Sequence, residues 1–305
     1  MLTASLLLDA AVSPRSARLR RWQGLLLHLL AMTSVFALWL AGFGNAMAAG
    51  VLATATMALF TVASNAKYRM LGEPLVFSDL ALIAGIFHHP RFYFTAIPVR
   101  QRWVAAIGAA AAVIALLPLI SSRPQPHLTG AGLLMSASGA LWLLLRTGRF
   151  DSIAPKPDLV SDVARFGLIA TLLLYWQRWR RAPAPQPCPA LAPIDDVTNS
   201  SAPQLIIVVQ CESFADPVEI TSETVPPLPG LDRTRTIAWQ HGDLHVSGFG
   251  AYTMRTEYGV LFGRSEPALG FRRYDPFLTA QSEASYALPA RLAGAGYRSS
   301  FVHPH

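Results

Sequence analysis

The sequence predicts a membrane domain of several α-helical spans, followed by an α/β domain outside the cytoplasm. Of the 305 residues, 52% are hydrophobic and only 14% are charged, and the mean hydropathy is +0.35. This composition is too apolar and too poor in charge for an ordinary soluble protein. Long apolar runs occur in the first 176 residues, whereas the apolar runs after residue 203 are short and alternate with helical patterns. That alternation is typical of an α/β layer.

Five apolar segments are expected to span the membrane, because about 20 apolar residues cross the hydrocarbon core of a bilayer. The first, residues 24–42, follows an arginine-bearing stretch over residues 1–23. A cleaved signal peptide is the alternative for it, since Ala46-Met47-Ala48 resembles a cleavage site. Its length and the second span that follows at once argue against cleavage. The other four spans, of which the last two are short, are 46–64, 103–120, 128–145 and 163–176.

Residues 65–93 mix apolar and polar positions between the second and third spans. Glu73, Pro74 and Asp79 interrupt the apolar pattern. We expect an amphipathic helix over residues 75–87 that lies at the membrane interface and need not span.

The basic residues predict the orientation in the membrane through the positive-inside rule. With a cytoplasmic N-terminus, the inner segments contain Arg15, Arg18, Arg20, Arg21, Lys67, Arg69, Arg91, Arg100, Arg102, Arg146, Arg149 and Lys156. The outer segments contain Arg123 and an exceptional cluster at Arg178, Arg180 and Arg181. The balance predicts that everything after residue 182 lies outside the cytoplasm. The net charge of +7 forms no single basic stripe, which argues against nucleic-acid binding.

The predicted organisation has four parts. A cytoplasmic N-terminus (1–23) and a membrane domain (24–177) precede a proline-rich tether (178–203) and a C-terminal domain (204–305). The tether is expected to be semi-rigid and unable to form a packed core. Two cysteines, Cys188 and Cys211, are too few for a disulfide framework or a cysteine metal site.

The C-terminal domain is predicted to contain strands that alternate with helices. The apolar run over 204–210 has the pattern of a strand buried on both faces of a parallel sheet. Residues 243–246 and 297–302 are further candidate strands, and 283–293 have a helical pattern. In such a fold, functional sites lie at the carboxyl ends of the strands.

A glycine-rich stretch over residues 245–263, HVSGFGAYTMRTEYGVLFG, leads into a predicted helix. Thr253 is expected at or near its N-cap, where unpaired N–H groups and the helix dipole favour negative charge. Gly263 is expected to end the helix. The apolar residues that share one face of this helix are Met254, Tyr258, Leu261 and Phe262. Taken alone, Thr253 is either a simple cap or a nucleophile.

Two further polar residues follow predicted strands. Glu212 ends the first strand, where a carboxylate can bind a metal ion or cap the next helix. His303 ends the third strand at the same rim. Together with Thr253, these residues define a candidate site.

These features resemble the lipoteichoic acid synthase and phosphoglycerol transferase family, within the alkaline phosphatase and sulfatase superfamily. The resemblance rests on five spans, a proline-rich tether, a strand ending in Glu-Ser-Phe, a threonine four residues before Glu-aromatic, and Gly-Tyr before a strand ending in histidine. The segment NAKYRMLGEPLVFSDL is also similar to the membrane region of that family. By motif position, the resemblance implies that Thr253 is the nucleophile and a metal contact, Glu212 a metal ligand and His303 a head-group-binding residue. Thr256 is the competing nucleophile.

The resemblance further implies an alkaline-phosphatase-like domain with one divalent metal ion, Mn²⁺ or alternatively Mg²⁺ or Zn²⁺. The expected donor is a phospholipid such as phosphatidylglycerol, and the expected acceptor is a glycan of the cell envelope. The expected location is a bacterial inner membrane, with the lipid bilayer as a partner.

The sequence departs from the family because an Asp-His pair and a further histidine, expected beyond the third strand, are missing. We therefore expect an incomplete catalytic domain that is inactive as it stands. A sulfatase-like or phosphodiester hydrolase is one alternative. A non-catalytic membrane scaffold or transporter-like protein is the alternative from another class.

Overall fold

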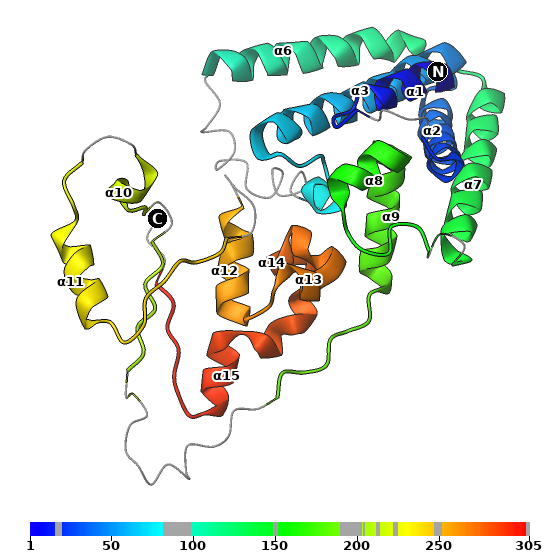
Figure 1. The fold of residues 1–305 in the computed structure, drawn as a ribbon. Coiled ribbons are helices and arrows are strands. Elements are labelled where there is room, and N and C mark those ends of the chain that lie inside the picture. Colours follow the sequence, from blue (N-terminus) through cyan, green and yellow to red (C-terminus); the bar gives the residue numbers. More distant parts are fainter. Residues whose placement is uncertain are drawn as a thin grey trace. The chain divides into compact units, whose positions relative to one another are not determined.

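Figure 1 shows the chain as a ribbon, taken from a computed structural model. It describes residues 1–15, 20–81, 99–148, 150, 152–189, 203, 205–211, 214–221, 225–246 and 252–302, apart from some side chains between 101 and 113. The chain forms two compact units, which are described separately. Unit 1 comprises Met1–Ala184 and Pro267–Ala280, and unit 2 comprises Pro185–Glu266 and Gln281–His305.

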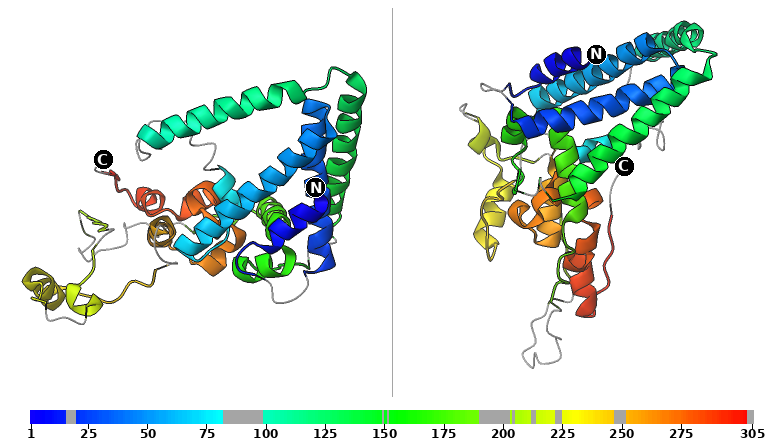
Figure 2. Two further views of the ribbon diagram at one scale, coloured as in Figure 1. Left: turned by 90° about the horizontal axis from the view of Figure 1, so that it is seen from above. Right: turned by 90° about the vertical axis from the view of Figure 1, so that its right-hand side faces the viewer.

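Three helices of unit 1 are long and apolar enough to cross a membrane: α2 (Trp22–Phe43), α3 (Ala46–Leu71) and α7 (Pro124–Arg146). They confirm that the segments predicted as spans over 24–42, 46–64 and 128–145 are long apolar helices. Both views of Figure 2 show these helices packed beside one another. The turn between α2 and α3 is short because Gly44 adopts the left-handed conformation and the Asn45 side chain accepts hydrogen bonds from the N–H groups of Met47 and Ala48.

α7 begins where α2 ends and packs antiparallel to it. Ser121 N donates to Phe43 O at 2.8 Å. The His127 ring lies 2.7 Å from Ala41 O and 2.9 Å from Ser121 O. The bundle therefore has a Gly44 end, where α7 begins, and a Trp22 end, where α2 begins and α3 and α7 end.

The third predicted span, 103–120, corresponds to α6 (Val99–Leu116) and the 3₁₀ helix η1 (Leu117–Leu119). Residues 77–81 of the predicted interfacial helix are helical, and its remainder lies outside the described residues.

The fifth predicted span, 163–176, is not one helix. It is divided into α8 (Leu159–Phe166) and α9 (Leu168–Arg181) at Gly167, whose φ of 92° suits glycine. A Cβ at Gly167 would lie 2.2 Å from Arg20 Nη1, so the break also makes room for a neighbouring side chain. α9 has 14 residues, about 21 Å, which is shorter than the roughly 30 Å hydrocarbon core.

The N-terminal residues add a short helix, α1 (Leu2–Ala10), with two buried polar side chains. Ser5 Oγ lies 3.0 Å from His28 Nε2 on α2. Asp9 forms an ion pair with Arg20 and accepts a hydrogen bond from Leu168 N at 3.0 Å. This buried cluster joins α1 to the starts of α2 and α9.

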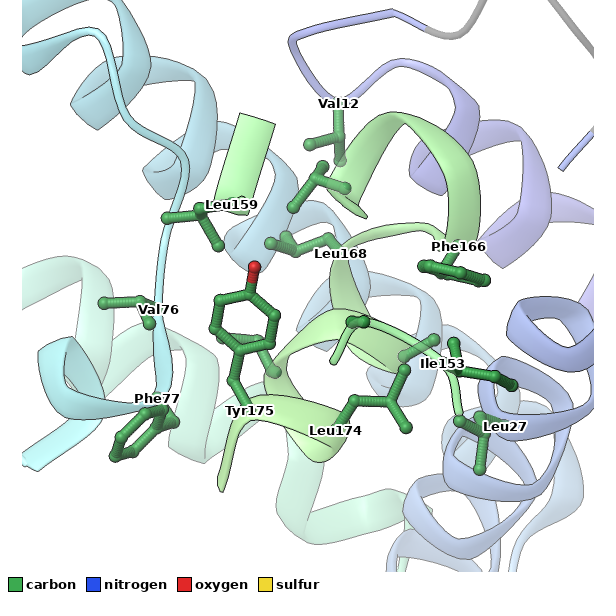
Figure 3. Packing of buried hydrophobic residues seen from close by; sticks show 14 of the residues in the cluster. Val12, Leu27, Val76, Phe77, Ile153, Leu159, Phe166, Leu168, Leu174 and Tyr175 are labelled. Carbon is green, nitrogen blue, oxygen red and sulfur yellow. The ribbon is translucent and has the colours of Figure 1, made fainter. Parts of the chain in front are cut away.

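The hydrophobic core of unit 1 gathers around α8 and α9, as Figure 3 shows. Tyr175 is fully buried, and its hydroxyl donates to Asp162 Oδ2 at 2.6 Å and accepts from Asp158 N at 2.9 Å. Because its polar atom is bonded, the tyrosine is buried without an unpaired group. Residues before, within and after the spanning helices thus share one core.

Unit 2 contains short helices in its described residues: α10 (Pro217–Ile220), α11 (Pro229–Ile237), α12 (Thr253–Phe262), η4 (Gln281–Tyr286) and α15 (Leu288–Gly294). The pair η4 and α15 replaces the single helix predicted over 283–293. The chain passes between the units through α13 (Glu266–Leu269), and η3 (Gly270–Tyr274) and α14 (Pro276–Thr279) belong to unit 1.

The predicted α/β layer is not formed by the described residues, which include no strand. In the three segments predicted as strands, apolar side chains are exposed: Ile207 by 74%, Val209 by 75% and Val302 by 87%. A parallel strand is stable when neighbouring strands pair with its edges and helices cover its faces. The described residues do not supply that layer of neighbours, so the strands predicted from the apolar pattern are not found among them.

Candidate functional site

Thr253 is the first residue of α12, and its side chain is exposed. Tyr252 occupies the N-cap position and makes no side-chain capping hydrogen bond. The predicted place of Thr253 at or near the start of the helix is therefore confirmed within one position. At this position the hydroxyl lies in the first turn, where helical N–H groups lack intrahelical acceptors and the dipole is positive.

A buried pair supports the start of α12. The Arg255 guanidinium lies over the Tyr252 ring at 3.9 Å from its centroid, and both residues are buried. Arg255 N also donates to Tyr252 O at 2.9 Å. The pair places a cation within one turn of the Thr253 hydroxyl and holds the N-cap against the helix. The spacing of an aromatic residue three positions before an arginine was the available sequence signal for this contact.

The second half of α12 is held by aromatic stacking and by an ion pair. Tyr258 is buried and stacks on Phe262, with centroids 3.9 Å apart and planes 8° apart. Gly263 ends the helix with a φ of 60°, as predicted. Arg264 Nε lies 2.6 Å from Oε2 of the fully buried Glu283 on η4, and this hydrogen bond raises the pKa of Arg264. The helix that carries Thr253 is therefore braced at both ends.

Glu257 lies one turn after Thr253 and is partly buried. Glu212, Gly248, Gly250 and His303 lie outside the described residues. Their roles therefore stay predictions. Among the residues that the structure does describe, no group of three or more His, Cys, Asp or Glu side chains could hold a metal ion. The divalent metal also stays a prediction.

Comparison with known proteins gives one informative similarity. The chain is 30% identical over 266 residues to the capsular polysaccharide biosynthesis protein RkpI of Rhizobium meliloti (strain 1021). The alignment covers 81% of this chain and 49% of RkpI, so the chain spans about half the length of this curated relative. No protein-family model and no solved structure matches the chain.

Proposed function

We propose that this chain is the membrane-bound part of a bacterial inner-membrane transferase that moves a phospho-alcohol, such as phosphoglycerol, from a phospholipid to a cell-envelope glycan. The observation that carries the proposal is the exposed Thr253 hydroxyl at the start of a braced helix. The similarity to RkpI supports a polysaccharide as the acceptor, and the three apolar helices support a lipid donor.

The proposed reaction has two displacements at phosphorus. Thr253 Oγ loses its proton and attacks the phosphodiester of the lipid; the new Oγ–P bond replaces the P–O bond to diacylglycerol, whose oxygen takes up a proton. A hydroxyl of the glycan then attacks the phospho-threonine and loses its proton, and Thr253 Oγ leaves and is protonated again. A threonine hydroxyl suits this role only when its oxyanion is stabilised.

Two features of the chain favour negative charge at Thr253. Thr253 is the first residue of α12, so its hydroxyl belongs to the turn that carries the unpaired helical N–H groups and the positive end of the dipole. Arg255 adds a cation in the same turn. Both favour an alkoxide and a bound phosphoryl group over the neutral, empty state.

A divalent ion is expected to assist this chemistry. The carboxylate of Glu212 and the hydroxyl of Thr253 are oxygen donors, the type that Mn²⁺ or Mg²⁺ prefers, although such an ion takes about six ligands. When bound, the ion would lower the pKa of the hydroxyl. His303 is proposed to contact the lipid head group.

The test is to introduce Thr253→Ala into the gene in its own cell and to measure phospho-alcohol bound to the envelope glycan by mass spectrometry. The expected result is complete loss, whereas the matched variant Thr256→Ala retains the modification. Normal modification in Thr253→Ala would disprove the proposed nucleophile and favour a non-catalytic membrane role. Loss of lipid head groups to water, with no modified glycan in the unsubstituted strain, would favour a hydrolase.

A further inference from the structure

The chain returns to unit 1 directly after the helix that carries Thr253. α12 ends at Phe262, three residues follow, and α13 begins at Glu266. We define the docking segment as Pro267–Ala280, the C-terminal stretch that belongs to unit 1. Its hydrogen bonds and ring contacts show what holds it there.

The docking segment forms hydrogen bonds to three other parts of unit 1. Trp179 Nε1 on α9 donates to Thr279 O at 2.8 Å. Arg272 Nη2 donates to the carbonyls of Ala182, at 3.2 Å, and Pro183. Ser78 Oγ, after the end of α3, donates to Tyr274 O at 3.3 Å. Because these partners are far apart in sequence, the segment is held by tertiary structure.

Aromatic rings fill the space between these hydrogen bonds. Tyr175 contacts Phe271 edge-on, with centroids 5.0 Å apart, and lies 5.6 Å from the Tyr274 ring. Phe77 stacks on Trp179 at 5.3 Å. Tyr274 is buried, so the contact excludes water. Figure 3 shows Phe77 and Tyr175 in this part of the core.

The docking segment limits how far Thr253 can move from unit 1. The 10-residue α12 is about 15 Å long, and the connection to Pro267 adds at most about 18 Å. Thr253 thus stays within roughly 33 Å of Pro267. The proline-rich stretch over 185–203 can by itself reach about 60 Å, so it constrains the position of Thr253 far less.

The contacts of α9 also show at which end of the helix bundle, and therefore at which membrane face, this helix lies. Near its start, Leu168 N donates to Asp9, which is joined to Arg20 before α2. Near its end, Arg178 Nη2 donates to Ile153 O at 2.9 Å, and Arg181 Nη2 donates to Arg146 O at 2.8 Å. Both ends of α9 therefore contact the Trp22 end of the bundle, and α9 does not cross to the Gly44 end.

We propose that the docking segment fixes the Thr253-bearing part of the chain to the membrane face at which α2 begins and α3 ends. This differs from the sequence-based topology, which places residues 65–102 and residues after 182 on opposite faces. The new arrangement also collects Arg20, Arg21, Arg146 and the Arg178–Arg181 cluster on one face, leaving Arg123 at the other. Such asymmetry is typical of membrane proteins, and the positive-inside rule assigns the basic face to the cytoplasm.

Cysteine labelling tests the shared face with two matched positions on α3. Met47 and Met70 are exposed and lie near opposite ends of this helix. In a Cys211→Ser background, an impermeant maleimide is applied to intact spheroplasts and to inverted vesicles of Met47→Cys and Met70→Cys, with native Cys188 as the reporter for unit 2. Labelling after detergent treatment confirms that each thiol is reactive.

We expect Met70→Cys and Cys188 to be labelled from the same side, and Met47→Cys from the opposite side. Labelling of Met70→Cys and Cys188 from opposite sides would overturn the proposal. So would labelling of all three from one side, because α3 would then not cross the membrane.

Limited trypsin digestion tests the docking itself. Trp179→Ala removes the ring stack and the hydrogen bond to Thr279, and we expect cleavage after Arg272 or Arg273 to become about tenfold faster through local opening. The control Trp176→Ala alters the same helix at a half-exposed ring that contacts Arg180, and it is expected to leave the rate unchanged. Trp179→Phe keeps a ring against Phe77 but loses the hydrogen bond to Thr279, so we expect an intermediate cleavage rate. That result would show that the faster cleavage of Trp179→Ala does not come from general misfolding.

Equal cleavage rates in Trp179→Ala and the unsubstituted chain would refute the docking role. Neither experiment measures transfer, so the docking proposal can stand if the proposed function fails, and the reverse also holds.

Discussion

The two units differ in how far their apolar residues are buried. In unit 1, apolar side chains from α2, α3, α8, α9 and the docking segment form one buried core. In unit 2, the equally apolar run at 205–209 is exposed. The α2–α3 hairpin brings two apolar helices together locally, and α8, α9 and the docking segment then cover them. A parallel strand is buried only when neighbouring strands and covering helices are present. Changes in unit 1 should therefore cost stability that similar changes in unit 2 do not.

The largest effect is expected from Asp9→Asn. Asp9 is 2% exposed and pairs with Arg20, and burial lowers the pKa of Arg20 to about 10. Leaving Arg20 buried without its partner should cost about 3–5 kcal/mol, measured by thermal unfolding in detergent.

The matched control in unit 2 is Asp216→Asn, which removes a partner of the more exposed Arg235 at 2.9 Å. It should not change the unfolding temperature measurably, because solvent screens such pairs. The double variant Asp9→Asn, Arg20→Leu should recover part of the loss. A double variant no more stable than Asp9→Asn would show that the ion pair is not the cause.

A smaller effect is expected where α7 packs on α2. A Cβ at Gly130 would lie 2.3 Å from Ala41 N, whereas a Cβ at Gly132 meets nothing within 4 Å. Gly130→Ala should destabilise unit 1 by about 1–3 kcal/mol through overpacking. Gly132→Ala in the same helix should be neutral or stabilising by up to about 1 kcal/mol, because alanine favours helices. Equal unfolding temperatures for both variants would contradict the observed packing.

A pH-dependent effect is expected at Asp162. Burial raises the pKa of its carboxyl above the ordinary 3.8, and the hydrogen bond from Tyr175 opposes this shift only in part. The folded state thus keeps the proton to a higher pH than the unfolded state. The associated stability is present below pH 3.8 and is lost as the pH rises through the folded pKa. In unfolding measurements at a series of pH values, Asp162→Asn should reduce this loss of stability with rising pH. An unchanged dependence of stability on pH would show that the Asp162 carboxyl is not its cause.

The smallest effect is expected in the apolar run of unit 2. Ile207 and Val209 are 74% and 75% exposed, so Ile207→Ser and Val209→Ser should change the stability of the chain by less than about 0.5 kcal/mol. A loss of about 2 kcal/mol or more in either variant would instead indicate the buried strand that the sequence pattern predicts.

Part of the candidate site was predictable from the sequence. The helix that begins at Thr253 and ends at Gly263 follows from local signals, because a threonine after a glycine-rich stretch and a left-handed glycine act within a few residues. The support by Tyr252, Arg255 and Glu283 was not predicted, because it depends on side chains that meet only after folding. The association of Glu212 and His303 with Thr253 stays a prediction.

The sequence by itself determined the three long apolar helices and the start and end of α12. Length, hydropathy and capping residues are local properties, and they suffice for such elements. Only the tertiary structure decided that Gly167 divides the fifth apolar segment, because the break accommodates Arg20 and Asp9 from distant positions. It also decided that the described residues of unit 2 form no sheet and that Pro267–Ala280 belongs to unit 1, since both depend on contacts between residues far apart in the chain.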